Sequence, residues 1–236
     1  MKIILSLWLI IFPLVCNALP ITAKSWLVAD SDGNVIQSKN INEIRSIASI
    51  TKLMTVMVVL DANQDLDQRL TQHTRRDLIN LALIKSDNAA ANTLCEKYPG
   101  GYNKCIDAMN KKTQVLGMSQ TKFKDATGLS IFNISTARDL ITLVLTAKNY
   151  MEIVTASNTG KIKIKNQKKS ITVNTTNPIV NRRHDFIVSK TGWTNASGGC
   201  IAMMLGTETG QRIVILLGSK NTQTRIPEAE FIIDKT

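Results

Sequence analysis

The sequence predicts an α+β fold in which one antiparallel sheet takes strands from both chain ends and a helical subdomain is inserted between them. Short apolar runs with a period of two lie near residues 25–38 and again after residue 161. Between them, apolar residues recur with the spacing of amphipathic helices. No linker rich in Pro, Gly or Ser divides the chain, and 236 residues with 44% hydrophobic and 20% charged side chains suit one globular domain.

The predicted elements follow in order from these patterns. Two short strands flank the turn-forming run Asp30–Asn34, which indicates a β-hairpin. The apolar run 49–60 begins a series of five helices, the last of which opens with Thr136 and Asp139 at capping-box spacing. A final helix is predicted to begin at Pro227, with acidic residues in its first turn. The strands are predicted at 25–29, 35–38, 161–165, 170–173, 186–190, 201–206 and 212–218, and the five helices at 49–60, 76–85, 89–98, 102–116 and 136–148.

Residues 1–18 are predicted to be a signal peptide. Lys2 supplies the positive end, a mostly apolar run extends to Val15, and small residues precede a cleavage position after Ala18. This run is shorter than the roughly 20 residues of a membrane-spanning helix. A lipoprotein acylated on Cys16 is the less favoured alternative, because Val15 is not the small residue that this signal prefers. We therefore expect a periplasmic protein without a transmembrane anchor in its mature chain.

The chain is basic, with 29 Lys and Arg residues against 18 Asp and Glu residues and a net charge of +11. Most of this charge is interpreted as solvated surface. Lys161, Lys163 and Lys165 alternate with isoleucines, which predicts a strand with one basic face. An exported basic protein can be drawn to anionic cell-envelope polymers, whereas nucleic-acid binding is not expected because no recognisable module for it is present.

The sequence lacks the motifs that several enzyme classes require. The two histidines, His73 and His184, lie in polar, basic stretches, which disfavours a Ser-His-Asp hydrolase. No HExxH or CxxC motif supports a zinc site, and no glycine-rich phosphate-binding loop is present. We expect no metal and no organic cofactor.

After export, Cys95, Cys105 and Cys200 would lie in an oxidising compartment. Cys95 and Cys105 are ten residues apart across a Gly-Gly break, so they can form a disulfide. The alternative is three buried thiols that act as small apolar side chains. No cysteine lies near a histidine in the sequence, so a cysteine nucleophile is given little weight.

Three short motifs carry candidate chemistry, and the first is Ser49-x-x-Lys52. On a helix this spacing places both side chains on one face, one turn apart. The residues around Lys52 are apolar, and burial lowers a lysine pKa, so a neutral amine can act as a base toward the Ser49 hydroxyl. The helix start beside Ser49 would stabilise developing oxyanion charge. The motif alone is weak, because a second SxxK occurs at Ser119–Lys122 and a snorkelling lysine gives the same pattern.

The second motif, Ser86-Asp87-Asn88, interrupts a helical pattern. There a serine hydroxyl can relay a proton and an asparagine amide can hold a peptide carbonyl. The simpler interpretation is a helix cap. Because SxN tripeptides recur at 38–40 and 219–221, this motif is also weak by itself.

The third motif, Lys190-Thr191-Gly192, follows the apolar strand 186–188 and is predicted to lie at a strand end. Lys190 supplies positive charge and Thr191 a hydroxyl, while Gly192 permits the close approach of a substrate backbone. The simpler interpretation is a strand followed by a turn. The KTG tripeptide occurs once in the chain.

The ordered set SxxK, SDN and KTG is far more specific than any member, and the three motifs occur together in penicillin-binding proteins and class A β-lactamases. With YPGGY (98–102), LGMSQTKF (116–123), TGLS (127–130) and STARDL (135–140), the sequence resembles the low-molecular-mass penicillin-binding proteins, the serine D-alanyl-D-alanine carboxypeptidases and endopeptidases. YPGGY and STARDL place it nearest to the endopeptidase branch. The resemblance implies a β-lactamase/transpeptidase-like fold for a single DD-peptidase domain at residues 19–236.

The resemblance also implies a role for each motif residue. Ser49 would attack the D-Ala-D-Ala carbonyl to form an acyl-enzyme, and Lys52 would take its proton. Ser86, with Lys190 nearby, would pass a proton to the leaving amine. Asn88 would hold the substrate amide.

Substrate binding is assigned by the same resemblance. Backbone N–H groups of Ser49 and Trp193 would form the oxyanion hole. Thr191 would bind the terminal carboxylate, assisted by Arg225, for which the alternative is an exposed arginine at a helix start. The implied partners of this monomer are peptidoglycan peptides, with β-lactam antibiotics as covalent inhibitors.

Two departures from the family pattern bear on these expectations. Ser49 and Ser86 are 37 residues apart, which is shorter than expected and predicts that a surface hairpin beside the active site is missing. The chain ends 46 residues after Lys190, so we expect neither the extra β-domain nor the C-terminal amphipathic anchor of many carboxypeptidase relatives.

Three classes of function remain open: a DD-peptidase, a β-lactamase and an inactive peptidoglycan-binding module. Class A β-lactamases use a glutamate between SDN and KTG to activate the hydrolytic water. Only Glu96 and Glu152 lie in that interval, both in helical patterns, and Asp125 is the nearest loop carboxylate, interpreted as a turn residue. All motif residues are present, which favours an enzyme. The sequence does not separate carboxypeptidase from endopeptidase activity.

Overall fold

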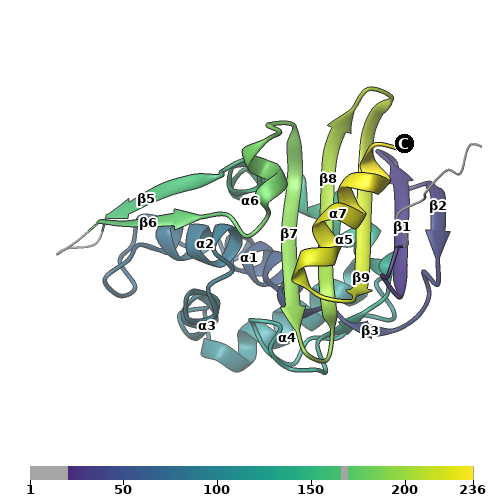
Figure 1. Cartoon of the computed structure of the whole chain (residues 1–236). Helices are drawn as coiled ribbons and strands as arrows, with labels where there is room; N and C mark the ends of the chain where they lie inside the picture. The colour runs from purple at the N-terminus through teal and green to yellow at the C-terminus, as the bar shows by residue number, and fades with distance from the viewer. Residues whose placement is uncertain (1–20, 166–169, 236) are drawn as a thin grey trace, which may run out of the picture.

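The structure, a computed structural model, describes residues 21–165 and 170–235, so the predicted signal peptide and Cys16 lie outside the described residues. Its centre is a five-stranded antiparallel sheet of strand order β2-β1-β9-β8-β7 (Figure 1). Two strands come from the N-terminal part and three from the C-terminal part, which confirms the predicted topology. The strands are β1 (Ser25–Asp30), β2 (Val35–Lys39), β7 (Phe186–Thr194), β8 (Gly198–Thr207) and β9 (Gly210–Ser219).

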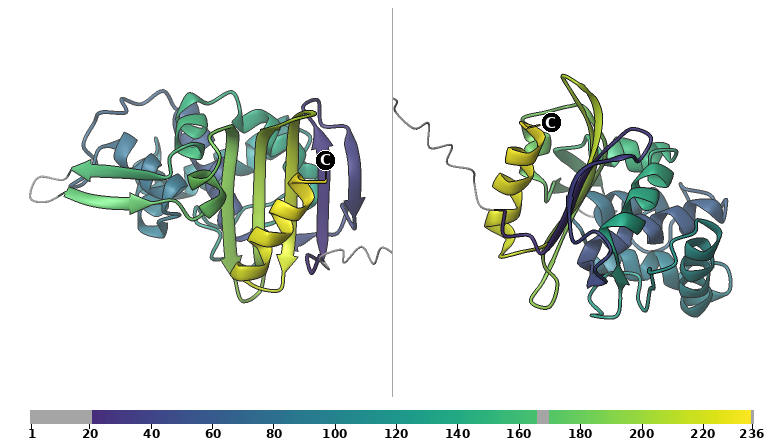
Figure 2. Two further views of the ribbon diagram at one scale, coloured as in Figure 1. Left: turned by 45° about the horizontal axis from the view of Figure 1, so that its top comes forward. Right: turned by 90° about the vertical axis from the view of Figure 1, so that its right-hand side faces the viewer.

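Strand β9 is buried on both faces, because successive side chains of a strand point to opposite sides of the sheet. Ile213 and Ile215 join the larger apolar core, whereas Val214 joins a smaller core on the other side. Helix α7 (Thr222–Ile233) covers the smaller core, and helix α5 (Ala137–Ala147) packs on the opposite face (Figure 2). The sheet is therefore the middle layer of the molecule.

The helical subdomain packs on the larger core. The five helices predicted for this subdomain begin and end within two residues of those in the structure, but α6 lies where no element is predicted. Thr136 caps α5 by accepting the Asp139 N–H, while the Asp139 carboxylate binds Thr121 instead of completing a capping box. None of the helices in the described residues is long and apolar enough to cross a membrane. Besides α5, the helices are α1 (Thr51–Asp61), α2 (Arg75–Ile84), α3 (Asn88–Glu96), α4 (Gly101–Val115) and α6 (Met151–Ser157).

Two small sheets and two 3-10 helices complete the fold. The small sheet that contains the predicted basic strand has the expected alternation, because Lys161, Lys163 and Lys165 are exposed while Ile164 is buried. The pairs are β3 (Arg45–Ser46) with β4 (Ile134–Ser135) and β5 (Lys161–Lys165) with β6 (Ser170–Asn174), and the 3-10 helices span Ala48–Ile50 and Pro178–Asn181.

Two predicted boundaries differ from the structure by four residues or more. The KTG motif lies inside β7 rather than at its end, because β7 stays paired with β8 as far as Thr194. The last helix begins at Thr222 rather than at Pro227, because the Asn221 side chain caps it by accepting the Thr224 N–H. Pro227 therefore lies within the helix.

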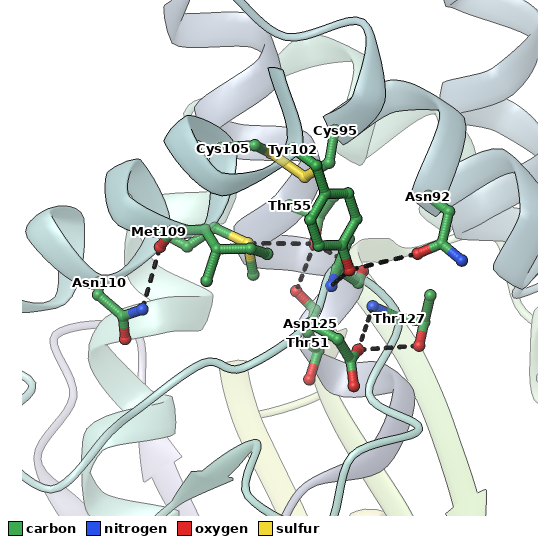
Figure 3. The surroundings of a disulfide bond; sticks show 12 residues. Thr51, Thr55, Asn92, Cys95, Tyr102, Cys105, Met109, Asn110, Asp125 and Thr127 are labelled. Carbon is green, nitrogen blue, oxygen red and sulfur yellow. Dashed lines mark hydrogen bonds between the residues drawn. A yellow bond between two sulfur atoms is a disulfide. The ribbon is translucent and has the colours of Figure 1, made fainter. Parts of the chain in front are cut away.

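Cys95 of α3 and Cys105 of α4 form a disulfide (Figure 3). Cys200 is a buried free thiol. Of the two predicted alternatives, pairing of Cys95 with Cys105 is correct. Both half-cystines are fully buried in the larger core, so the bond joins two neighbouring helices from within.

Reduction of the Cys95–Cys105 bond is predicted to lower the free energy of unfolding by about 2–3 kcal/mol, because the bond restricts the unfolded chain. The two cysteines are 10 residues apart, which makes this a short loop with a moderate entropic effect. Urea unfolding of oxidised and reduced protein, followed by circular dichroism, measures the difference, with Cys200 a thiol in both samples. Equal unfolding midpoints would contradict the prediction.

Candidate active site

Ser49 is the middle residue of the first 3-10 helix, Ala48–Ile50, which leads directly into α1 at Thr51. Its hydroxyl accepts a hydrogen bond from the Lys52 amine at 2.8 Å. The preceding residue, Ala48, has a φ of +46°, a left-handed conformation that is uncommon for a residue with a side chain. The SxxK spacing thus brings serine and lysine into contact at a strained helix start.

The Lys52 side chain is fully buried, with 0% exposure, and its amine donates three hydrogen bonds. The acceptors are Ser49 Oγ and Asn88 Oδ1, both at 2.8 Å, and the backbone carbonyl of Thr127 at 2.7 Å. Of these three groups only the serine hydroxyl can also donate, because carbonyl oxygens carry no proton. A Lys52 amine that loses a proton therefore directs its lone pair at the Ser49 hydroxyl.

Burial lowers the pKa of Lys52 from 10.5 to about 8, against the opposing effect of the Asp125 and Asp87 carboxylates. With this pKa, about one molecule in ten carries the neutral amine at pH 7. The neutral form is thus accessible under physiological conditions.

The Ser86-Asp87-Asn88 motif forms the connection between α2 and α3. Ser86 has a φ of +60°, Asp87 caps α3 by accepting a backbone N–H of its first turn, and Asn88 is the first residue of that helix. The helix-cap interpretation therefore holds for Asp87. Its two neighbours contact lysines instead, Asn88 with Lys52 and Ser86 with Lys190.

Strand β7 supplies a second lysine–serine pair. Lys190 Nζ donates to Ser86 Oγ at 2.9 Å and to the backbone carbonyl of Thr191 at 2.8 Å. Complete burial, together with the positive charges of Lys52 and Arg225, lowers the pKa of Lys190 well below its ordinary value. Both lysines of the cluster are buried while both serines are partly exposed, so an approaching molecule meets the hydroxyls.

The rest of the KTG strand borders the Ser49 backbone. A Cβ on Gly192 would lie 2.8 Å from Ser49 N, so the missing side chain allows β7 to approach the Ser49 segment itself. Thr191 is buried and shares a 2.6 Å hydrogen bond with the Thr176 hydroxyl. Trp193, in contrast, is 46% exposed.

Arg225 is buried in α7, which overturns the alternative of an exposed arginine at a helix start. Its guanidinium donates to the backbone carbonyl of Gly192. Its Nε is buried without a hydrogen-bond partner among the described residues. Arg225 thus supports the KTG strand from the side of α7.

Sequence reasoning did not single out Thr127 or Thr176. Thr127 takes part through its backbone carbonyl, which side-chain patterns do not report, although it begins the TGLS segment. Thr176 follows β6, and its N–H donates to the last residue of α2, which ties this segment to the helical subdomain. In the second SxxK motif, by contrast, Ser119 and Lys122 are both exposed, so the Lys122 amine remains hydrated.

Comparisons with known proteins agree with this arrangement. The chain matches the family described as peptidase S11, D-alanyl-D-alanine carboxypeptidase, over residues 15–72 and 66–221. It is 39% identical over 207 residues to the D-alanyl-D-alanine endopeptidase of Escherichia coli, covering 78% of this chain and 67% of the relative. It is 35% identical over 233 residues to the D-alanyl-D-alanine endopeptidase of Pseudomonas aeruginosa, covering 89% of this chain and 75% of the relative.

Two solved structures show the same architecture. Penicillin-binding protein D2 of Listeria monocytogenes in its ampicillin-bound form is 25% identical, with a TM-score of 0.81 over 92% of this chain and 98% of that chain. The Streptomyces K15 DD-transpeptidase is 23% identical, with a TM-score of 0.85 over the same shares. These likenesses confirm the predicted β-lactamase/transpeptidase-like fold. Together with the sequence matches, they show that the chain belongs to the D-alanyl-D-alanine carboxypeptidase family of serine peptidases.

Proposed function

We propose that this protein is a periplasmic D-alanyl-D-alanine peptidase that cleaves peptidoglycan stem peptides through an acyl-serine intermediate and is acylated by β-lactams. The observation that carries the proposal is one cluster of two buried lysines, each hydrogen-bonded to a partly exposed serine at 2.8–2.9 Å. Family membership supports the peptidase activity, and the predicted signal peptide supports export.

In the proposed acylation, Ser49 is the nucleophile and Lys52 is the base. Neutral Lys52 takes the hydroxyl proton while Ser49 Oγ forms a bond to the carbonyl carbon of the scissile D-alanyl bond. The negative charge moves to the carbonyl oxygen, where backbone N–H groups of Ser49 and Trp193 would hold it. Asn88, fixed by its hydrogen bond to Lys52, would hold the substrate amide.

Collapse of this intermediate breaks the C–N bond, and the leaving amine must gain a proton. We assign this transfer to Ser86, which would pass the proton taken up by Lys52 on to the leaving amine. The Ser86 hydroxyl accepts a hydrogen bond from Lys190 at 2.9 Å. Thr191 and Arg225 would bind the terminal carboxylate of the substrate. Water then hydrolyses the acyl-serine ester and restores the free hydroxyl.

Cleavage of cross-links is the proposed specificity. The three relatives named endopeptidases are 33–39% identical to this chain, whereas two relatives named carboxypeptidases are 24% and 28% identical. An endopeptidase cuts the bond between a D-alanine and the side chain of a neighbouring stem peptide. Its leaving group is then a longer amine than a single D-alanine.

The carboxylates between SDN and KTG disfavour a β-lactamase. Glu96 is exposed at the end of α3, and Glu152 lies in the first turn of α6. The Asp125 carboxylate accepts four hydrogen bonds from its own turn, so it is not free to activate water. A DD-peptidase, which deacylates slowly after reaction with a β-lactam, fits this arrangement better.

Ser49→Ala is predicted to abolish covalent labelling by a fluorescent penicillin, because the acyl bond forms on Ser49 Oγ. Fluorescence of the protein band after denaturing electrophoresis measures the label. Ser119→Ala, which changes the second SxxK motif, is the matched control and should label like the wild type. Label that persists on the Ser49 variant would overturn the proposed nucleophile. Wild-type label that decays within seconds would indicate a β-lactamase, and folded wild type without label would indicate a binding module.

The acylation rate is predicted to rise with pH and to level off above about pH 8, because the reaction needs neutral Lys52, whose pKa is about 8. Below that pKa the neutral fraction falls about tenfold for each pH unit, so the rate should fall by the same factor. Stopped-flow labelling from about pH 5.5 to about pH 9 measures the profile. A rate that does not change over this range would contradict the assignment of Lys52 as the base.

Purified cross-linked muropeptide dimers are predicted to be split into monomers, because an endopeptidase cleaves the D-alanyl bond that joins two stem peptides. Mass spectrometry of the products distinguishes this reaction from the loss of one D-alanine from an uncross-linked pentapeptide. The Ser49→Ala protein serves as the control without product. Loss of D-alanine as the main reaction would assign the chain as a carboxypeptidase instead.

A further inference from the structure

We infer that Asp125 is a positioning residue for the proposed acylation, because its carboxylate shapes a turn, residues 125–130, that supports both Ser49 and Lys52. The inference rests on the proposed function, since it gives Asp125 a part in the same reaction. Asp125 acts on the reacting groups through the backbone of this turn.

The Asp125 carboxylate is the centre of the 125–130 turn. Its Oδ1 accepts from Thr127 N at 2.6 Å, from Thr127 Oγ1 at 2.8 Å and from Gly128 N at 2.7 Å, and its Oδ2 accepts from Ser130 N at 2.6 Å. Burial opposes ionisation, but the hydrogen bonds from the turn outweigh it, so the pKa of Asp125 lies below its ordinary value. At neutral pH the turn is therefore folded around a charged carboxylate.

The same turn touches both groups of the proposed reaction. The carbonyl of Thr127 accepts a hydrogen bond from Lys52 Nζ at 2.7 Å. Gly128, with a φ of +87°, packs on the nucleophile segment so closely that a Cβ would lie 1.9 Å from Ala48 O and 2.8 Å from Ser49 N. The Asp125 carboxylate thus orders two parts of the turn. One is the Thr127 carbonyl that accepts from Lys52, and the other is the Gly128 backbone that packs against Ser49.

Other side chains hold the turn in place independently of the Asp125 carboxylate. Thr55 Oγ1 donates to the carbonyl of Ala126 at 2.8 Å, and the N–H of Ala126 donates to Tyr102 Oη at 3.2 Å, near the disulfide (Figure 3). Asn133 Nδ2 donates to the backbone carbonyl of Asp125 at 2.9 Å. Because these contacts use backbone atoms of the turn, they remain available when only the Asp125 side chain is changed.

The carboxylate also acts on Lys52 through its charge. Asp125 and Asp87 are the two groups that raise the pKa of Lys52 against the larger effect of burial. Lys52 in turn is one of the two positive charges, with Arg225, that lower the pKa of Lys190. Removing the negative charge of Asp125 should therefore make neutral Lys52 more abundant at a given pH, while the loosened turn holds that neutral amine less well.

Asp125→Asn separates these effects, because asparagine keeps the size and one acceptor oxygen but loses the charge and the acceptor for Ser130. We expect the plateau rate of penicillin labelling to fall by about tenfold as the nucleophile and base lose their alignment. The midpoint of the pH profile should shift down by roughly half a unit, the modest end of the effect of a nearby charge. A purely structural role would not move this midpoint.

Asp30→Asn is the matched control. Asp30 accepts backbone N–H groups of Asp32 and Asn34, both at 2.9 Å, in the turn between β1 and β2, so it has the same kind of contacts without a link to the cluster. This variant should keep both the plateau rate and the midpoint of the wild type.

Asp125→Glu is the second variant. It keeps the charge but moves it by one methylene, so it should retain a midpoint near that of the wild type while its plateau rate falls.

The inference is overturned if folded Asp125→Asn labels with the wild-type rate and midpoint, or if its midpoint stays while only its rate changes. If Asp125→Asn does not fold, Asp125→Glu decides: a wild-type plateau rate overturns the inference and a reduced rate supports it. Wild-type protein that takes no label would overturn the proposed function itself, which the other outcomes leave standing.

Discussion

A buried ammonium group with three acceptors organises the active-site cluster. When Lys52 is buried it loses its hydration, which is costly unless hydrogen bonds replace the lost water. Its acceptors belong to the 3-10 helix before α1, to the start of α3 and to the 125–130 turn, so all three segments must converge on one nitrogen. The contacts that make burial of this amine tolerable are therefore the contacts that assemble the site.

Unusual backbone positions make this convergence possible. Ala48 and Ser86 both have positive φ values, a conformation that costs on the order of 1 kcal/mol or more for a residue with a side chain. Gly128 and Gly192 approach the Ser49 segment, where any side chain at either position would collide with its backbone. The fold accepts local strain at the two serine segments and keeps glycine where backbones meet. This distribution is typical of a functional site that the surrounding packing holds in place.

Local sequence patterns predict which side chains are buried or lie in connections, but they do not predict which strands pair. The apolar neighbours of Lys52 indicate its burial, and the interrupted helix around Ser86 indicates a connection, so these residues could be found from the sequence. The end of β7 could not, because the strand continues past Gly192 only through its ladder with β8, which lies outside any local window. The start of α7 depends on a cap by Asn221. Pro227 is a more familiar signal for a helix start, so the sequence pattern favours a later start. The carbonyl of Thr127 is invisible to motif reasoning, since every residue has one.

The two lysines of the cluster act on each other, which bears on the order of proton transfers in the proposed reaction. The positive charge of Lys52 is among the causes that lower the pKa of Lys190. When Lys52 takes the proton of Ser49, its new charge makes a proton on Lys190 easier to release. Ser86 accepts a hydrogen bond from Lys190 and lies two residues before Asn88, which accepts one from Lys52. In the proposed acylation, the acidity beside Ser86 would therefore rise at the stage when the leaving amine needs a proton, and the mutual repulsion of the two amines would give the transfer its direction.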